Sequence, residues 1–336
     1  MKKSFWKKIV LAGLAVNLAL AATAQPVRVN LGTLAPRGSV YHQSLATLAE
    51  AWRTNGVKLV IYPDGTQGGE ADMVRLMRIG ALQAGMLTAV GLSEIEPGIN
   101  GLQDLPKLYN NFDELEYVTD KLRPMLEKRF ADKGFVVLFW VDAGWVRYFS
   151  KEPILTPTDL KRMKIFTWSG DTETARIMKI NGYNSVMLET SDILPGLETG
   201  LINATAVPPI FALAGQLDLR APHMLNLNWG PLVGACVIKK STWEKIPAAN
   251  RAALRAAAEK AGAEIRANSR KESDAAVAAM QKRGLIVHEV TPEQDAVWRT
   301  EAEKLYPEIR GHIVPADIFD EVQRLVKEYR ANTVKK

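Results

Sequence analysis

The residues that could carry out catalysis or bind a metal are thinly spread in this chain of 336 amino acids. None of its four histidines has a partner at metal-ligand spacing; they are His42, His223, His288 and His312. The first predicted strand runs into Gly32-Thr33-Leu34-Ala35-Pro36 and not into a glycine-rich nucleotide loop. A Walker loop and a G-x-S-x-G elbow are also missing. The sequence therefore predicts no metal, no cofactor and no serine hydrolase.

Acidic side chains are plentiful, but they do not form a recognisable catalytic set. The chain has 37 Asp and Glu residues, and no pair of them stands out with a base or an orienting partner. We therefore expect a binding protein and not an enzyme.

Positive charge is concentrated at the start of the chain. Basic residues exceed acidic ones by six, and four of the basic residues are Lys2, Lys3, Lys7 and Lys8. An apolar run over residues 9–22 and the small-x-small sequence Ala22-Thr23-Ala24 follow, which is typical of a secretory signal peptide over residues 1–24. The run ends too early for a membrane-spanning helix. We expect a periplasmic protein whose nearly balanced mature charge predicts no nucleic-acid partner.

The only cysteine, Cys236, cannot form an internal disulfide. It lies in an apolar stretch over residues 233–238, where a buried structural thiol is expected. An exported chain without disulfides must depend on a large core.

Strands and helices alternate in two series along the mature chain, which predicts an α/β fold with mainly parallel sheets. The first series has predicted strands at 27–31, 58–62, 82–88 and 135–141. The last of these runs is apolar throughout and suits a central strand covered on both faces. The second series has predicted strands at 146–149, 164–167, 185–188 and 203–207. We expect one lobe from residues 25–144 plus about 233–272, and another from 145–232 plus about 273–336 with the C-terminal helices.

An alanine-rich segment over residues 247–282 predicts a long helix. At about 1.5 Å per residue it would extend for about 50 Å, enough to bridge two lobes. The alternative is a pair of shorter helices broken at Gly262.

The stretch from Gly144 to Thr167, GWVRYFSKEPILTPTDLKRMKIFT, resembles the central signature of the DctP family, the extracytoplasmic solute receptors of TRAP transporters. Similar residues recur on both sides, at Leu31-Gly32-Thr33, Tyr62-Pro63, Leu105-Pro106 and Ser241-Thr242-Trp243. The resemblance covers nearly the whole mature chain. It implies a two-lobed periplasmic binding protein fold with a long helix bridging the lobes, and a TRAP membrane permease as partner.

Two positions depart from the ligand-binding pattern that the resemblance implies. Phe166 stands where the family has an arginine that grips the ligand carboxylate, and Val207, before Pro208, stands where a polar residue is common. Arg147 matches the family's other ligand-contacting arginine, one residue beyond the usual spacing; the alternative is an ordinary salt bridge. Trp168 follows Phe166 on the same strand face, so we expect both rings in the ligand pocket.

The first lobe is expected to contribute residues near the ends of its strands. In open α/β sheets, ligands gather at the carboxyl ends of the strands, which directs attention to Thr33 and Thr88. Tyr41 could also reach the ligand, and a capping or packing role is the alternative.

A pocket lined by aromatic and aliphatic side chains favours apolar ligand surface, at about 25 cal/mol per Å². We expect a TRAP-type receptor that closes on a small, relatively apolar organic solute and delivers it to a permease. The solute would be a monocarboxylate held by Arg147 or a neutral amphipathic molecule. The alternatives are a periplasmic carrier of hydrophobic ligands without a TRAP permease, and an enzyme using the same cleft with Glu173, Asp171 or His42 as its base. The oligomeric state stays open.

Overall fold

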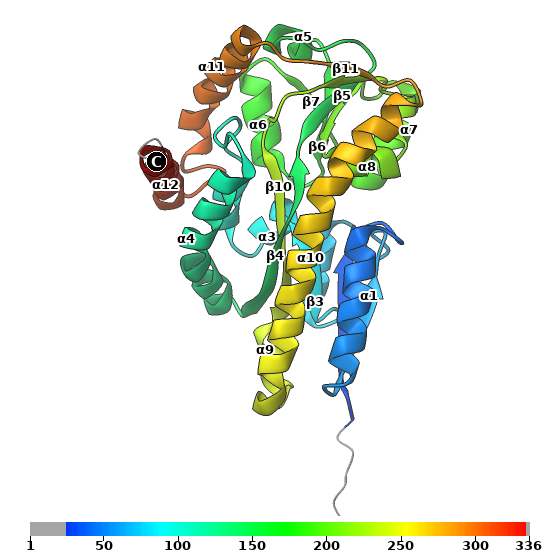
Figure 1. The fold of residues 1–336 in the computed structure, drawn as a ribbon, viewed down its shortest axis with the longest axis vertical. Coiled ribbons are helices and arrows are strands. Elements are labelled where there is room, and N and C mark those ends of the chain that lie inside the picture. Colours follow the sequence, from blue (N-terminus) through cyan, green and yellow to red (C-terminus); the bar gives the residue numbers. More distant parts are fainter. Residues whose placement is uncertain (1–24, 334–336) are drawn as a thin grey trace, which may run out of the picture.

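The computed structural model describes residues 25–333 and contains two β-sheets flanked by helices (Figure 1). Sheet A has five strands in the order β2-β1-β3-β10-β4, and sheet B has six in the order β11-β9-β5-β8-β6-β7. This confirms the two-lobed α/β fold. The predicted signal peptide lies outside the described residues, and the residue limits of the two lobes remain a prediction.

Sheet A and its helices form the lower part of the molecule in Figure 1. Its strands are β1 (Val27–Thr33), β2 (Val57–Tyr62), β3 (Ala84–Thr88), β4 (Phe135–Trp145) and β10 (Pro231–Lys239). The accompanying helices are α1 (Val40–Arg53), α2 (Glu70–Ile79), α3 (Ala89–Ser93), η1 (Pro97–Leu102), α4 (Phe112–Asp132) and α9 (Lys240–Lys245).

Sheet B occupies the upper part. Its strands are β5 (Arg147–Ser150), β6 (Lys164–Trp168), β7 (Asn184–Leu188), β8 (Ala204–Val207), β9 (His223–Leu225) and β11 (Ile286–His288). The helices around it are α5 (Pro157–Lys161), α6 (Thr172–Ile180), η2 (Thr190–Asp192), α7 (Ile193–Thr199), α8 (Pro209–Ala214) and η3 (Leu217–Leu219). Two C-terminal helices, α11 (Pro292–Ile309) and α12 (Ala316–Thr333), complete the described chain.

Both sheets are mixed and not mainly parallel as expected. In sheet A, β10 runs antiparallel between β3 and β4, which leaves β4 at the sheet edge. The expectation that residues 135–141 form a central strand was therefore wrong about the strand order. Its apolar character is explained by α4 and α10, which both pack against β4.

Helix α10 (Ala248–Gln281) is a single helix of 34 residues, which confirms the long helix and excludes a break at Gly262. A Cβ atom at Gly262 would lie 2.7 Å from the Cβ of Phe139 on β4. Glycine at this position lets the helix approach the strand closely. Figure 1 shows α10 running from the level of α9 up to the helices around sheet B.

Polar side chains of α10 bind the free edge of β4. Arg255 donates to the Val137 carbonyl at 3.1 Å, and the Ser269 hydroxyl donates to the Asp142 carbonyl at 2.9 Å. Arg270 forms two hydrogen bonds to the buried Asp142 carboxylate, at 2.8 and 3.2 Å. The bonds to the Val137 and Asp142 carbonyls satisfy backbone groups that an edge strand would otherwise leave unpaired.

Two connecting segments join the sheets and pair with each other. Val146 links β4 to β5, and the segment before β10 returns from sheet B. The Val146 amide donates to the Gly230 carbonyl at 2.8 Å, and the Trp229 amide donates to the Val146 carbonyl at 3.3 Å. The passage between the sheets is thus a short two-stranded connection alongside α10.

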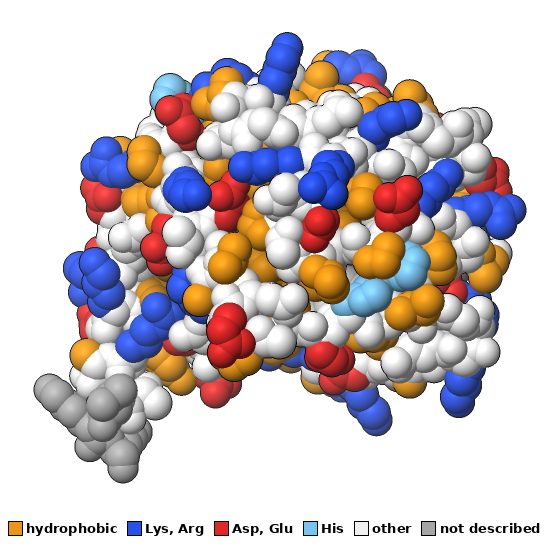
Figure 2. All heavy atoms as spheres, turned by 90° about the horizontal axis from the view of Figure 1, so that it is seen from above, with side chains coloured by type: hydrophobic (Ala, Val, Ile, Leu, Met, Phe, Trp, Pro, Cys, Tyr) orange, Lys and Arg blue, Asp and Glu red, His pale blue; other side chains and the backbone are white. Residues whose placement is uncertain are grey.

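Cys236 lies on β10 and is fully buried, as the sequence predicts. In Figure 2, basic and acidic side chains are interspersed with hydrophobic ones over the face seen from above. Within residues 25–333, no helix is long and apolar enough to cross a membrane.

Candidate functional site

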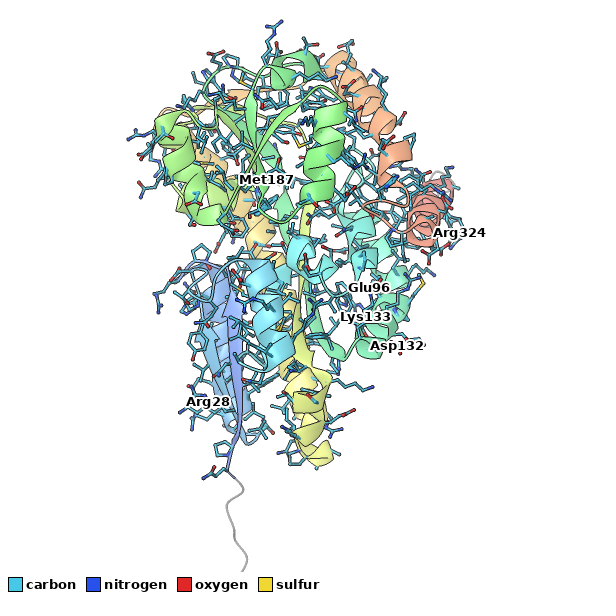
Figure 3. The ribbon with its side chains drawn as sticks, turned by 180° about the vertical axis from the view of Figure 1, so that it is seen from behind. Arg28, Glu96, Asp132, Lys133, Met187 and Arg324 are labelled. Carbon is cyan, nitrogen blue, oxygen red and sulfur yellow. The ribbon has the colours of Figure 1, made fainter. Side chains whose placement is uncertain are left out.

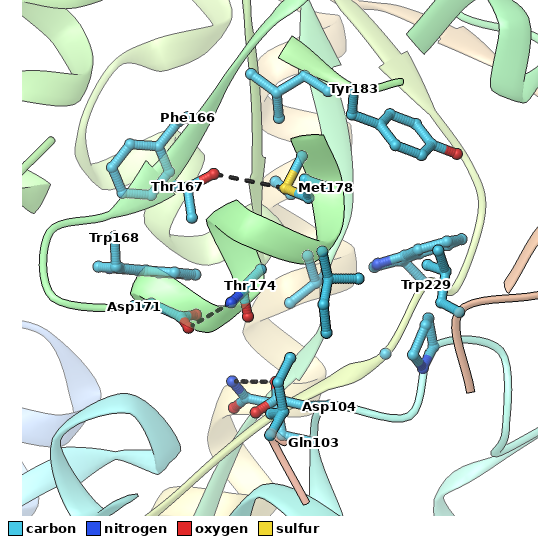
Figure 4. A pocket seen from close by; sticks show the side chains of 18 of the residues that line it. Gln103, Asp104, Phe166, Thr167, Trp168, Asp171, Thr174, Met178, Tyr183 and Trp229 are labelled. Atoms are coloured by element: carbon cyan, nitrogen blue, oxygen red, sulfur yellow. Dashed lines mark hydrogen bonds between the residues drawn. The ribbon is translucent and has the colours of Figure 1, made fainter. Parts of the chain in front are cut away.

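A cavity of about 180 Å³ lies between the two sheets, beside the connecting segments (Figure 4). We call it the interlobe cavity. Val90, Gln103, Asp104 and Pro106 line it from the side of sheet A. Sheet B and its helices contribute residues from β5, β6, α6 and β8. The wall is completed by Trp229 and by three aliphatic residues at or just beyond the end of α11, namely Leu305, Ile309 and Ile313. The cavity is therefore assembled from segments far apart in the sequence.

Aromatic rings form much of this wall. Phe166 and Trp168 both line it, and their ring centroids lie 5.1 Å apart in an edge-to-face arrangement. The indole NH of Trp168 donates to the Thr190 hydroxyl at 3.2 Å, which fixes the ring. Tyr148 and Trp229 stand on another side, with centroids 5.7 Å apart. These rings and the aliphatic side chains beside them make much of the cavity lining apolar.

Two carboxyl groups face this otherwise apolar space. Asp171 accepts a hydrogen bond from the Thr174 amide at 3.2 Å and thereby caps the start of α6. Asp104 accepts a 3.4 Å bond from the Gln103 side chain. Burial, reinforced by the nearby charge of Asp171, raises the pKa of Asp104 to about 8. Burial also raises the pKa of Asp171.

A second hollow, also of about 180 Å³, adjoins the cavity and shares Asp104, Trp168 and Asp171 with it. We call it the acidic hollow, because its further charged or titratable residues are Glu70, Glu94, Glu173, Glu189 and His312. Among the described residues, neither a lysine nor an arginine lines it or the interlobe cavity.

Glu70 has a structural role at the edge of this hollow. Its buried carboxylate accepts hydrogen bonds from the Thr88 amide at 2.7 Å, from the Thr88 hydroxyl and from the Gly91 amide at 2.9 Å. These bonds hold the start of α3 against α2. Thr88, a predicted site residue, is thus engaged with Glu70.

The predicted residues Thr33, Tyr41 and Thr88 lie together around a third, smaller hollow of about 60 Å³. Tyr41 stacks on Phe211 of α8, with ring centroids 5.7 Å apart. The Thr33 hydroxyl accepts a hydrogen bond from the Ala35 amide at 3.1 Å, which shapes the turn after β1.

Arg147 does not line the interlobe cavity. It lines a hollow of about 270 Å³ beside α10, together with Pro209, Ser273 and Asp274. Its Nε atom is buried and has no hydrogen-bond partner within residues 25–333, and burial lowers the pKa of Arg147 while Asp274 and Glu289 oppose that effect. Val207 is its antiparallel neighbour on β8, and Pro208 is the N-cap residue of α8. Neither Val207 nor Pro208 lines the interlobe cavity.

Asp104, Gln103 and Trp229 are site residues that were not predicted from the sequence. Asp104 and Gln103 follow η1, and Trp229 lies in the connection before β10, so no local spacing relates them. Asp171 was considered only as a base for the enzyme alternative. The sequence does place Asp171 just before a predicted helix, and Asp is a favoured N-cap residue. This pattern could have predicted the capping role of Asp171, but not its place in the cavity.

The arrangement is suited to binding a solute. In the part of the chain that the structure describes, no group of three or more His, Cys, Asp and Glu residues could hold a metal ion. The largest features of the cavity are apolar walls with a few polar groups, which is the usual form of a small-molecule site.

Comparison with known families decides what kind of protein this is. Residues 31–311 match the family model described as bacterial extracellular solute-binding protein, family 7, also called DctP. The chain belongs to this family. The resemblance in the sequence is thereby confirmed, and so is the expectation of a binding protein and not an enzyme.

Relatives of this solute-binding protein cover most of its length. The C4-dicarboxylate-binding periplasmic protein DctP of Rhodobacter capsulatus is 23% identical over 308 residues, which are 89% of this chain and 91% of the relative. A TRAP periplasmic solute-binding protein from Ralstonia eutropha, solved with bound (S)-2-acetolactate, has a TM-score of 0.82 at 21% identity. It covers 90% of this chain and 99% of its own. A protein of the same description from Chromohalobacter salexigens, with bound D-glucuronate, has a TM-score of 0.81 at 20% identity and covers 89% of this chain and 99% of its own.

Proposed function

We propose that this protein is the periplasmic receptor of a TRAP-type transporter and captures a small, relatively apolar organic solute. The observation that carries the proposal is the interlobe cavity, whose lining comes from both sides of the fold and whose aromatic rings come from the side of sheet B and from Trp229. A solute that fills it would contact both lobes at once. Such a solute binds the closed form more tightly than an open one and therefore shifts the population towards closure.

The proposed solute is a monocarboxylate or a neutral amphipathic molecule. Relatives with named ligands bind small organic acids, including a C4-dicarboxylate and (S)-2-acetolactate. A dicarboxylate would lose its hydration among the rings around Phe166 with no basic side chain to replace it. Arg147 is the candidate partner for a single carboxylate, because its buried Nε atom has no hydrogen-bond partner among the described residues. This part of the proposal requires the solute to extend from the interlobe cavity into the hollow beside α10.

Delivery to a membrane permease and location in the periplasm are parts of the same proposal. The basic and apolar start of the chain supports export. The names of the relatives support the periplasm and, for the solved structures, a TRAP transporter.

The test begins with the solute that the protein retains. Residues 25–336 are expressed in the periplasm of a bacterial host and denatured, and the released small molecules are identified by mass spectrometry. The solute is then added back, and its affinity is measured by calorimetry for the parent protein, for Arg147→Gln and for the control Arg28→Gln, which replaces an exposed residue of β1. We expect a carboxylate-bearing solute to bind at least tenfold more weakly to Arg147→Gln alone. Failure to bind any organic solute would overturn the proposed function.

A further inference from the structure

Tyr41 of α1 and Phe211 of α8 meet where the sheet A side of the molecule faces the sheet B side. Figure 1 shows both helices on the same side of α10, and both pack against it. The two rings are stacked, with centroids 5.7 Å apart and planes 19° from parallel. We infer that this pair is a latch that sets how readily the receptor closes without solute: the ring stack favours closure, and the buried Tyr41 hydroxyl opposes it. The inference rests on the closure that the proposed function requires.

Phe211 covers the small hollow that contains Tyr41. This hollow of about 60 Å³ is lined by α1, by α2, by the strands β3, β4 and β10, and by the end of β1 with the two residues after it. All of these segments belong to the sheet A side. Among the described residues, Phe211 is the one lining residue that comes from the sheet B side. Movement of α8 away from α1 would therefore open the hollow to water.

Helix α8 is anchored on sheet B and reaches across with one part of its surface. Ala212 belongs to the apolar core beside sheet B, whereas Ile210 and Phe211 pack against the core that α1 and α10 form with sheet A. These contacts with the sheet A core exist only while the two sides are together. Burial of apolar surface and stacking of the rings thus favour the closed form.

The hydroxyl group of Tyr41 acts in the opposite direction. The side chain is 4% exposed, and its buried oxygen makes no hydrogen bond within residues 25–333. The Ser269 hydroxyl of α10 lies nearby, but it donates to the Asp142 carbonyl at 2.9 Å and does not bond Tyr41. In an open form, water reaches the Tyr41 hydroxyl. Closure then either removes its hydrogen bonds or immobilises a water molecule beside it, and both cost free energy.

The two opposing effects keep the empty receptor open enough to admit a solute. Neither Tyr41 nor Phe211 lines the interlobe cavity or the hollow beside α10, so the latch acts on closure without touching a solute in either place. A solute in the interlobe cavity adds contacts that are available only in the closed form, and these shift the population towards closure. The latch thereby makes closure depend on the solute.

The test measures the distance between the two sides in the empty protein. Spin labels are attached at Arg28→Cys on β1 and at Met187→Cys on β7, two exposed positions that lie in the lower and upper parts of the molecule in Figure 3. Cys236 is fully buried, so the labels are directed to the two new thiols. Bound solute is removed by unfolding in guanidinium chloride and refolding. Double electron–electron resonance then gives the distances with and without phenylacetate, an apolar monocarboxylate.

Two variants separate the two parts of the latch. Tyr41→Phe keeps the ring and removes the hydroxyl, and Phe211→Ala removes the cover. We expect the closed fraction of the empty receptor to rise about threefold or more in Tyr41→Phe and to fall by a similar factor in Phe211→Ala. Calorimetry should show the affinity for phenylacetate changing in the same directions, because apparent affinity follows the population of the binding-competent form.

Tyr109→Phe and Leu213→Ala are the matched controls. Tyr109 is also buried on the sheet A side, but its hydroxyl bonds the Gly101 carbonyl at 3.3 Å. Leu213 lies on α8 and packs against the core beside sheet B. Neither substitution should change the distance between the labels, and circular dichroism checks that every variant is folded.

The outcomes distinguish the latch from the proposed function. An empty Tyr41→Phe receptor as open as the parent, or a parent already closed without solute, would overturn the latch. If phenylacetate still shortens the distance or binds, the receptor function stands. If neither phenylacetate nor the solute retained from the host binds the parent or changes its distance, the proposed function fails and the latch fails with it.

Discussion

Phe166 and Trp168 differ in what they do, although both rings line the interlobe cavity. Phe166 is 4% exposed and belongs to the apolar core on one face of sheet B. Trp168 is half-buried and lies where the interlobe cavity and the acidic hollow meet. The first ring is therefore mainly a core residue, and the second is mainly a wall of the site.

We predict different effects when each ring is removed. Phe166→Ala should lower the free energy of unfolding by about 3–5 kcal/mol, because it leaves a cavity in the core. Trp168→Ala should lower it much less but should weaken solute binding about tenfold or more. Urea unfolding and calorimetry on both variants measure these effects, and each variant is the control for the other. Equal loss of stability in both would contradict the division of roles.

The local sequence around these residues predicted the strand and its faces, but it did not predict the partners across the cavity. Thr167 points away from Phe166, and its hydroxyl lies 3.6 Å from the Met178 sulfur, as strand alternation requires. Asp104 and Trp229 meet this strand only because of the way the chain folds. Their roles could not be predicted from any nearby residue.

At the scale of elements, α10 depends on the absence of a side chain at Gly262. Glycine usually lowers helix stability by about 1 kcal/mol relative to alanine, which made a break at this position reasonable. Here the gain from packing α10 closely on β4 outweighs that cost, because a Cβ atom would collide with Phe139.

We predict that Gly262→Ala lowers the free energy of unfolding by about 1–3 kcal/mol, although alanine is the better helix former. Ala263→Leu, on the exposed side of the same turn, should change it by no more than about 0.5 kcal/mol. Chemical denaturation followed by circular dichroism measures both. An increase in stability for Gly262→Ala would show that β4 moves aside without cost.

The strand β4 shows that a hydrophobic pattern can predict the burial of a strand without predicting its position in the sheet. Its apolar run correctly predicted burial on both faces, but α4 and α10 provide that cover while the strand lies at the sheet edge. Burial of a strand and its place in the strand order are separate properties. Only the second depends on where β10, which arrives much later in the chain, inserts.

At the scale of the whole molecule, the two sheets are linked by α10 and by the paired segments at Val146 and Gly230. Because both lobes pack on the same helix, we expect that neither can unfold without disturbing it. A solute in the interlobe cavity contacts both sides. Binding should therefore stabilise the molecule as one unit.

We predict a single thermal transition that moves to higher temperature with solute. At a concentration of about 100 Kd, the solute should add about 2.7 kcal/mol to the free energy of unfolding. Differential scanning calorimetry, with Trp168→Ala as the weakly binding control, measures the shift. Two separate transitions, only one of which responds to the solute, would contradict the coupling of the lobes.

The sequence by itself determined the α/β class, most helix starts and the long helix. It also supplied the family resemblance. All of these features depend on residues close together in the chain. Thr156, for example, caps α5 through a reciprocal bond pattern with Asp159 that needs only neighbouring residues. The tertiary structure decided the order of the strands, the placing of Arg147 and of Trp168 in different hollows, and the shared cavity of Asp104 and Asp171. The physical reason is that burial and charge at the site are set by segments more than two hundred residues apart, such as those of Val90 and Ile313, whose contacts exist only after the chain has folded.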